Sequence, residues 1–141
     1  MKKLFFGMGL ILVISLNVYA QEPGGVKVCL LAKGIHSWNG DVLPNYPKGR
    51  PEITILKIII PPKARLAWHK HPVINAGVLL KGELTVVTQD KKILHLKAGD
   101  SLIEVINKWH YGKNEGNNPA EIIVFYAGIK GKPITIRKMG Q

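Results

Sequence analysis

The sequence predicts an all-β fold, either a sandwich or a barrel. Its apolar residues fall mostly in short runs that are rich in valine and isoleucine, as in β-strands. Turn-forming residues separate these runs at intervals of about 8 to 12 residues, which is typical of many short strands. No stretch shows the sustained apolar period of about 3.6 residues that an amphipathic helix requires.

The first twenty residues have the form of a secretory signal peptide. A start with two lysines precedes the apolar run 4–16, and Val18 and Ala20 occupy the small-residue positions before a cleavage site. The run is too short to span a membrane comfortably. We therefore expect residues 1–20 to be a signal that is cut after Ala20. The mature chain would then be periplasmic or secreted, without a stable membrane span; an uncleaved anchor is the alternative.

The mature chain, residues 21–141, has the length of one ordinary domain. Without the two lysines of the signal it carries 18 basic and 9 acidic side chains, a net charge of +9. Such a balance favours anionic partners. The basic residues are scattered in ones and twos, however, without an arginine-rich run or an aromatic–basic repeat. No nucleic-acid partner is therefore expected.

Residues 21–52 are expected to add an N-terminal strand and a loop to this domain. The run 26–32 is apolar and predicts a strand, in which the only cysteine, Cys29, would be buried and inert. Residues 33–51 are rich in glycine, proline and asparagine with aromatic residues between them, which indicates an ordered loop. This loop can either cover a barrel opening or wrap the domain.

The remaining strands of the domain, residues 53–141, follow one another with a turn after each. The first is β-branched and apolar, and two prolines end it. The turns "KGE", "QDKK" and "KAGD" separate the next strands, and a long loop precedes Pro119. The expected strands are 53–60, 66–71, 73–80, 84–88, 93–96, 101–106, 121–127 and 134–137.

Two histidines stand two residues apart in the second of these strands. Residues at i and i+2 of a strand point to the same face, so His69 and His71 project together. Imidazole is the commonest metal ligand in proteins, although surface pairs explain most such spacings. If the chain stays extended across Pro72, Asn75 faces the same cavity.

A third histidine lies downstream in the stretch 98–114. Gly99 begins a turn, a short strand follows, and His110 stands near the far end, with Asn114 closing the stretch. A histidine at this place would lie at the mouth of a barrel.

These two stretches resemble the paired motifs of the cupins. The first cupin motif is G-x5-H-x-H-x3,4-E-x6-G, and His69, His71 and Gly82 match it in this sequence. Asn75 stands where the family usually has Glu, and Lys63 stands at the leading Gly.

The second cupin motif is G-x5-P-x-G-x2-H-x3-N. Gly99, His110 and Asn114 match it in register, whereas Val105 stands at the Pro and Asn107 at the second Gly. The resemblance covers residues 53–127, which is most of the mature chain.

The resemblance implies a small antiparallel jelly-roll barrel with a divalent transition metal near one mouth. Its ligands would be His69, His71 and His110, with Asn75 as a weak ligand or a neighbour of the ligands. An asparagine offers only a neutral oxygen, so three neutral imidazoles would leave the ion its full charge. Such a site suits iron, zinc, nickel or copper better than manganese.

The histidine-rich site resembles those of cupin dioxygenases, isomerases and lyases. An exported, metal-dependent enzyme acting on a small molecule is the first hypothesis, with Glu104 and Tyr111 as candidate catalytic residues. Glu104 can instead be a solvated residue on the outer face of its strand. The second hypothesis is a non-enzymatic module that binds a small ligand or a sugar. By resemblance, the chain is also expected to form a homodimer.

Overall fold

The computed structural model describes residues 24–140. The predicted signal peptide therefore lies outside the described residues. The chain divides into two units, Met1–Leu30 and Leu31–Gln141. In the described part of the first unit the expected strand is wrong, because only one isolated bridge residue occurs there. Cys29 is exposed, not buried as expected.

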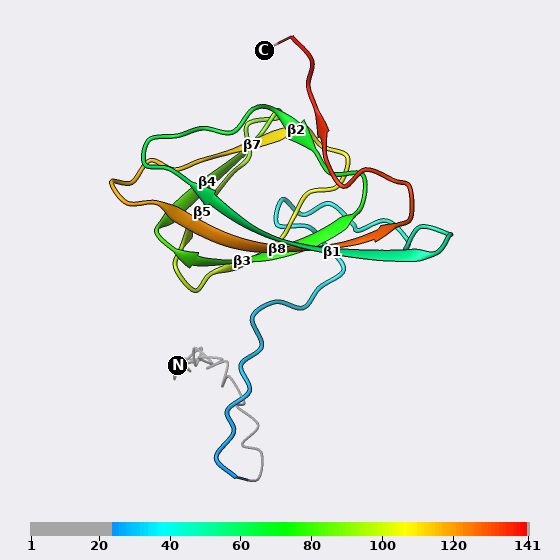
Figure 1. Cartoon of the computed structure of the whole chain (residues 1–141), viewed down its shortest axis with the longest axis horizontal. Helices are drawn as coiled ribbons and strands as arrows, with labels where there is room; N and C mark the ends of the chain where they lie inside the picture. Colours follow the sequence, from blue (N-terminus) through cyan, green and yellow to red (C-terminus); the bar gives the residue numbers. More distant parts are fainter. Residues whose placement is uncertain (1–23, 141) are drawn as a thin grey trace, which may run out of the picture. The chain divides into compact units, whose positions relative to one another are not determined.

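The second unit is built from nine strands in two sheets, and every neighbouring pair is antiparallel (Figure 1). One sheet has the order β1-β8-β3-β6 and the other β5-β4-β7-β2-β9. The strands are β1 (Pro51–Ile60), β2 (His69–Lys70), β3 (Ile74–Lys81), β4 (Glu83–Thr88), β5 (Ile93–Lys97), β6 (Ser101–Ile103), β7 (His110–Lys113), β8 (Ala120–Ile129) and β9 (Ile136–Arg137). The predicted all-β class is confirmed, since the described residues contain no helix.

Strand periodicity decides which side chains form the core between the two sheets. In β8 every second residue from Ala120 is buried, and in β3 the buried positions are the odd-numbered ones. The buried apolar cluster draws on both sheets, with Leu79 and Ile122 from one and Leu84 and Val86 from the other. The interior-facing residues therefore surround a common space, which is where the polar site lies.

Two strands differ from the expectation. The predicted strand 66–71 is reduced to the two residues of β2, and β7 lies in a stretch that was expected to be a loop. β7 has the sequence HYGK, whose single glycine and two polar residues give no strand pattern. It pairs with β4 on one side and β2 on the other, so tertiary pairing determines its structure.

Two further segments matter for the site. Residues 35–43, here called the strap, close on themselves through an isolated bridge between His36 and Val42. Between residues 33 and 50 the structure has no strand, only this bridge, turns and bends. The C-terminal segment carries β9, which pairs with β2. Within residues 24–140, no helix has the length and apolar character needed to cross a membrane.

Candidate metal centre

Three imidazoles meet inside the second unit. His69 and His110 are direct partners across β2 and β7, and therefore project from the same face of the sheet. Their ring centroids lie 4.4 Å apart, and the ring of His71 lies 5.0 and 5.1 Å from those of His69 and His110. One ring nitrogen from each lies within 4.8 Å of the others. The structure therefore brings together the three residues that the sequence singled out.

Backbone carbonyls fix the orientation of all three rings. The Nδ1 atoms of His69, His71 and His110 lie 2.8, 2.8 and 2.9 Å from the carbonyl oxygens of Ala67, Ile134 and Lys108, respectively. Because a carbonyl oxygen can only accept, each Nδ1 carries the proton and donates it. Each Nε2 then keeps its lone pair, which is the state that a metal ligand needs. This donor set fits a divalent transition metal.

Burial lowers the pKa of two of these imidazoles, those of His69 and His71. Desolvation is the main cause that lowers the pKa of His71 to about 3. The hydrogen bond to the carbonyl of Ile134 acts in the opposite direction, and electrostatic repulsion from His110 and His69 lowers the pKa further. Desolvation also lowers the pKa of His69, and the charges of His110 and Arg137 act in the same direction. Neutral imidazoles are competent ligands near neutral pH.

Asn75 lines the same cavity from the opposite sheet. It is fully buried, and its Nδ2 donates to the carbonyl of Val73 at 3.2 Å. Its Oδ1 atom has no hydrogen-bond partner, although buried polar atoms are nearly always paired. An unpaired acceptor in a cavity fits an additional partner, either an ion or a ligand. A metal-binding role for Asn75 stays a prediction.

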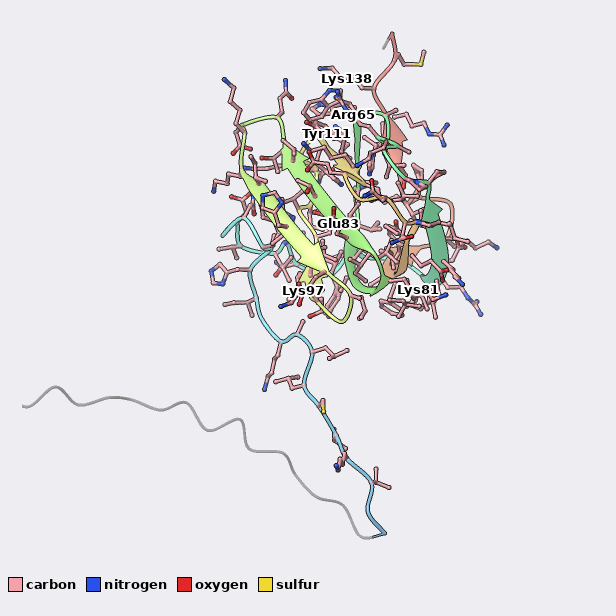
Figure 2. The ribbon with its side chains drawn as sticks, turned by 90° about the vertical axis from the view of Figure 1, so that its left-hand side faces the viewer. Arg65, Lys81, Glu83, Lys97, Tyr111 and Lys138 are labelled. Atoms are coloured by element: carbon pink, nitrogen blue, oxygen red, sulfur yellow. The ribbon has the colours of Figure 1, made fainter. Side chains whose placement is uncertain are left out.

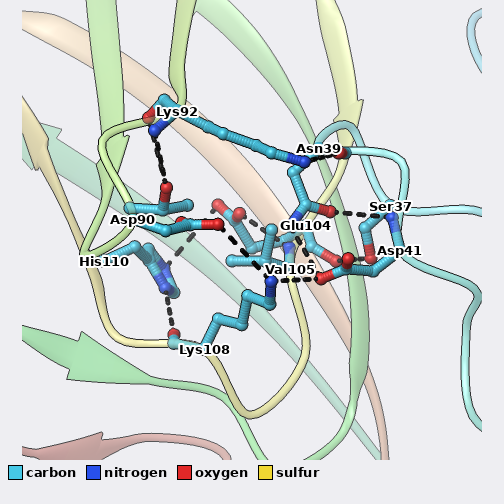
Figure 3. Close-up of polar contacts among 10 residues, drawn as sticks. Ser37, Asn39, Asp41, Asp90, Lys92, Glu104, Val105, Lys108 and His110 are labelled. Carbon is cyan, nitrogen blue, oxygen red and sulfur yellow. Dashed lines mark hydrogen bonds and ion pairs between the residues drawn. The ribbon is translucent and has the colours of Figure 1, made fainter.

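Glu104 also reaches the cavity, and its carboxylate is held on one side only. Its Oε1 accepts from the indole Nε1 of Trp38 at 2.7 Å and from the amide of Val105 at 2.8 Å. Its Oε2 lies 3.8 Å from Nε2 of His110 (Figure 3). Glu104 is not part of the group of three mutually close imidazoles. The carboxylate thus lies beside the candidate metal site, in reach of a bound molecule.

The strap holds Glu104 in this position. The Ser37 hydroxyl donates to the carbonyl of Glu104 at 2.9 Å, and the Trp38 amide donates to the carbonyl of Ile103 at 2.9 Å. Lys108 forms ion pairs with Asp41 at 2.9 Å and with Asp90 at 3.6 Å, which joins the strap to two neighbouring loops (Figure 3). The long N-terminal loop therefore supports one face of the site.

The three histidines, Asn75 and Glu104 line a cavity of about 480 Å³. Its volume lies in the usual range for small-molecule sites. Most of the remaining wall is aliphatic, contributed by Leu56, Ile58, Ile60, Leu66, Leu84, Val86, Leu102, Ile122 and Val124.

Tyr111 does not line this cavity, which corrects its choice as a catalytic residue. It follows His110 in β7, so strand alternation turns its side chain to the opposite face. There its ring makes an edge contact with Trp68, with centroids 4.7 Å apart, and the Arg65 guanidinium lies 3.8 Å from its centre (Figure 2). Tyr111 is thus part of a surface aromatic cluster.

Tyr126 is the tyrosine that does line the cavity, and sequence reasoning missed it. It is the direct partner of Asn75 across β3 and β8 and is 2% exposed. Burial raises the pKa of Tyr126 to about 12, with a contribution from the charge of Glu104. A tyrosine at an inward position of an otherwise apolar strand was the available signal. Thr135, whose hydroxyl lies 3.2 Å from Nδ1 of His71, was also missed as a site residue.

Asn114 is a structural residue of the site's surroundings. Its Nδ2 donates to the carbonyls of Ile60, Pro61 and Asn118 at 3.0, 3.2 and 2.8 Å, and its Oδ1 accepts from the amide of Gly116 at 2.9 Å. A single buried amide thus joins the end of β1 to the loop after β7.

Known structures resemble this one in fold. An uncharacterized conserved protein with a double-stranded β-helix domain from Klebsiella pneumoniae is 20% identical, with a TM-score of 0.54 over 67% of this chain and 89% of that one. The DMSP lyase from Ruegeria pomeroyi is 15% identical, with a TM-score of 0.55 over 73% of this chain and 49% of that one. An oxalate decarboxylase from Lactobacillus farciminis, crystallised as a formate complex, is 21% identical, with a TM-score of 0.53 over 60% of this chain. The match spans 26% of the oxalate decarboxylase chain.

The family comparison agrees with the fold and with the two histidine motifs. A search of curated proteins finds no match. Residues 56–126 match the family described as Cupin domain, and this range contains all three histidines of the site. The two antiparallel sheets are accordingly the jelly-roll barrel that the sequence predicted. The chain belongs to the cupin family.

Proposed function

We propose that this cupin is an exported, metal-dependent enzyme that acts on a small molecule. The observation that carries the proposal is the convergence of three imidazoles whose Nδ1 atoms are all tied to carbonyls, which leaves three Nε2 lone pairs for one ion. His69, His71 and His110 would hold that ion, and three protein ligands leave positions open for substrate or water. A bound ion would supply Lewis acidity or, if redox-active, oxygen chemistry.

Glu104 is the candidate general acid or base of the reaction. Its Oε1 is held by two N–H donors, whereas Oε2 faces the site and is free to take or give a proton. Tyr126 supports the same role from β8 of the same sheet, because its raised pKa keeps the hydroxyl protonated as a hydrogen-bond donor. An acid–base pair of this kind serves a lyase or isomerase directly and a dioxygenase during substrate deprotonation.

The donor set favours iron, zinc, nickel or copper as the metal. Three imidazoles are the only close ligand group among residues 24–140, and imidazole suits these ions. Manganese depends more on hard oxygen ligands, and the family position of such a ligand holds Asn75 here.

A non-enzymatic module that binds a small ligand or a sugar is the second candidate. The unpaired Oδ1 of Asn75 favours it, since a buried neutral acceptor can bind a hydroxyl or an amide of a ligand without chemistry. In this case the ion would only anchor the ligand.

Metal analysis tests the site first. We expect the purified mature protein to carry close to one transition-metal ion per chain by elemental mass spectrometry. His69→Ala combined with His110→Ala should abolish it, whereas the control His95→Ala should not, because His95 hydrogen bonds with Thr85 outside the cavity. Metal content unchanged by the double replacement would overturn the three-histidine site.

Turnover assays then separate the two functions. Oxygen uptake with phenolic, thiol and keto-acid substrates would indicate a dioxygenase, and conversion without oxygen uptake a lyase or isomerase. Ligand binding by the metal-loaded protein without turnover in any assay would favour the binding module.

We also propose export and a homodimer. Export rests on the signal-like residues 1–20, and it predicts Gln21 as the mature N-terminus by mass spectrometry. For the dimer, the outer face of β1 and β8 exposes the paired residues Ile55 and Phe125. Exposed apolar patches of this kind mark interfaces. Light scattering should give a dimer mass that Ile55→Lys reduces to a monomer.

A further inference from the structure

We propose that the cavity takes small carboxylates with an apolar body, and that Arg137 binds their carboxylate group. The inference rests on the proposed function, because it assumes that the three-histidine site lies at the reacting part of this cavity.

Register places Arg137 in one row with the histidines. Arg137 of β9 is the direct partner of His69 in β2, and His69 is in turn the direct partner of His110 in β7. Directly opposed residues of neighbouring antiparallel strands share a face, so all three side chains project toward the cavity. Arg137 and His69 both line it, with Arg137 on the edge strand and exposed to solvent.

The charge of Arg137 is available for a ligand. Among residues 24–140, the ion pairs involve other basic groups, and none includes Arg137. Arg65 also lines the cavity, but it differs because its guanidinium lies over the rings of Tyr111 and Trp68. Arg137 is thus the cation that can meet a molecule entering the cavity.

The charge balance of the cavity favours an anion. Glu104 is the only carboxylate among its lining residues, and the three histidines are neutral ligands. A divalent ion together with Arg137 would therefore leave an excess of positive charge beside Glu104. An anionic ligand would compensate this excess in a site partly shielded from water.

The rest of the wall determines what else the ligand carries. Apart from the polar site residues most of the wall is aliphatic, and the cavity volume of about 480 Å³ accommodates more than a bare anion. Apolar atoms of a ligand would gain from burial against this wall. A carboxylate is the anionic group that suits Arg137, because a guanidinium donates to a carboxylate through two parallel N–H groups.

The test uses phenylacetate and its neutral counterpart phenylacetamide as probes. Both are titrated into the zinc-loaded full mature chain by calorimetry, with wild type, Arg137→Gln and Lys138→Gln. Lys138→Gln removes the same charge from the next residue, which follows the end of β9 and does not line the cavity. Figure 2 shows Lys138 at the end where Arg65 and Tyr111 lie. Metal content of each variant is measured in parallel.

We expect wild type to prefer phenylacetate over phenylacetamide by about tenfold or more, as for a charge-assisted hydrogen bond. Arg137→Gln should lose this preference at unchanged metal content, and Lys138→Gln should keep it. Equal binding of the two probes by metal-loaded wild type would overturn the substrate class while the metal site stands. A preference that survives Arg137→Gln would overturn the role of Arg137.

Two further arms complete the test. Tighter binding of benzylphosphonate than of phenylacetate would overturn the choice of carboxylate in favour of phosphonate-like anions. If wild type binds no metal, the proposed function fails, and the titration is repeated on the metal-free chain. If the metal-free chain prefers phenylacetate and Arg137→Gln abolishes this preference, the anion site at Arg137 is supported without the metal. If the metal-free chain shows no such preference, the anion site is overturned.

Discussion

The Oε2 atom of Glu104 lies 3.8 Å from the Nε2 atom of His110. These are the two atoms that the surrounding hydrogen bonds leave free, because Oε1 of Glu104 and Nδ1 of His110 are both bound to protein groups. A carboxylate oxygen and the imidazole nitrogen that would hold a metal ion therefore lie side by side at the candidate site. The first prediction follows from this arrangement.

Glu104→Gln should keep the metal and lose the reaction. Glutamine has the same shape but cannot take a proton, so turnover of any substrate that wild type converts should fall roughly 10² to 10⁴-fold. Steady-state rates and elemental analysis on the same preparation check this. If the variant loses its metal instead, Glu104 is a ligand and not the acid or base.

Trp38→Phe should destabilise the fold by releasing the strap from the carboxylate. The indole of Trp38 donates to Glu104 at 2.7 Å, and a buried hydrogen bond to a charged group contributes about 2 kcal/mol. Urea unfolding of the metal-free protein measures this loss. The matched control is Trp109→Phe, whose ring contacts only the Lys70 ammonium among the aromatic and cation contacts of the described residues, at 5.0 Å. Equal loss in both variants would contradict a specific role for Trp38.

The metal-free protein should lose stability as the pH falls from about 6.5 toward 3. The pKa of His71 is near 6.5 in the unfolded chain and is lowered to about 3 by burial in the folded one. Between these values the unfolded state binds more protons, so acid favours unfolding by up to a few kcal/mol. The contribution is fully present above pH 6.5.

His71→Gln removes this group and should flatten the dependence. Denaturant unfolding at pH 7.5 and pH 5 measures both proteins in the presence of a chelator. His69, whose pKa is also lowered, leaves part of the slope in the variant. The same slope in both proteins would show that His71 is not the responsible group.

His69, His71 and Asn75 could be located from the sequence because strand alternation is a simple rule. It placed His69 and His71 on one face and Asn75 in the same cavity, and the structure agrees. The same rule, applied one residue beyond His110, would have excluded Tyr111. That candidate was chosen from its proximity in the sequence, which in a strand implies opposite faces.

The remaining site residues depend on contacts that no local pattern encodes. Trp38 and Glu104 are 66 residues apart, and the strap that joins them has no periodicity. Arg137 is placed by the register of β9, a two-residue edge strand. Pairing of such short strands is fixed only by the assembled fold, since register needs a long patterned strand to be specified.

Two residues that replace motif glycines, Lys63 and Asn107, adopt the left-handed backbone conformation that glycine favours. Lys63 and Asn107 stand at motif glycines and have positive φ angles of 60° and 55°. For residues with a Cβ atom this left-handed conformation costs about 1 kcal/mol, less for asparagine than for lysine. Both residues thus combine a side chain with the left-handed backbone that glycine favours.

Lys63→Gly should therefore be more stable than Lys63→Ala, by about 1 kcal/mol, although both remove the same Nζ hydrogen bond to the carbonyl of Glu115. The difference between the two variants isolates the backbone effect, because only the alanine retains the Cβ atom. Urea unfolding of the metal-free proteins measures it. The control pair is Lys132→Gly and Lys132→Ala, at an exposed position without a positive φ, where glycine should be no better than alanine. A glycine advantage at Lys132 as large as at Lys63 would show that the left-handed turn is not its cause.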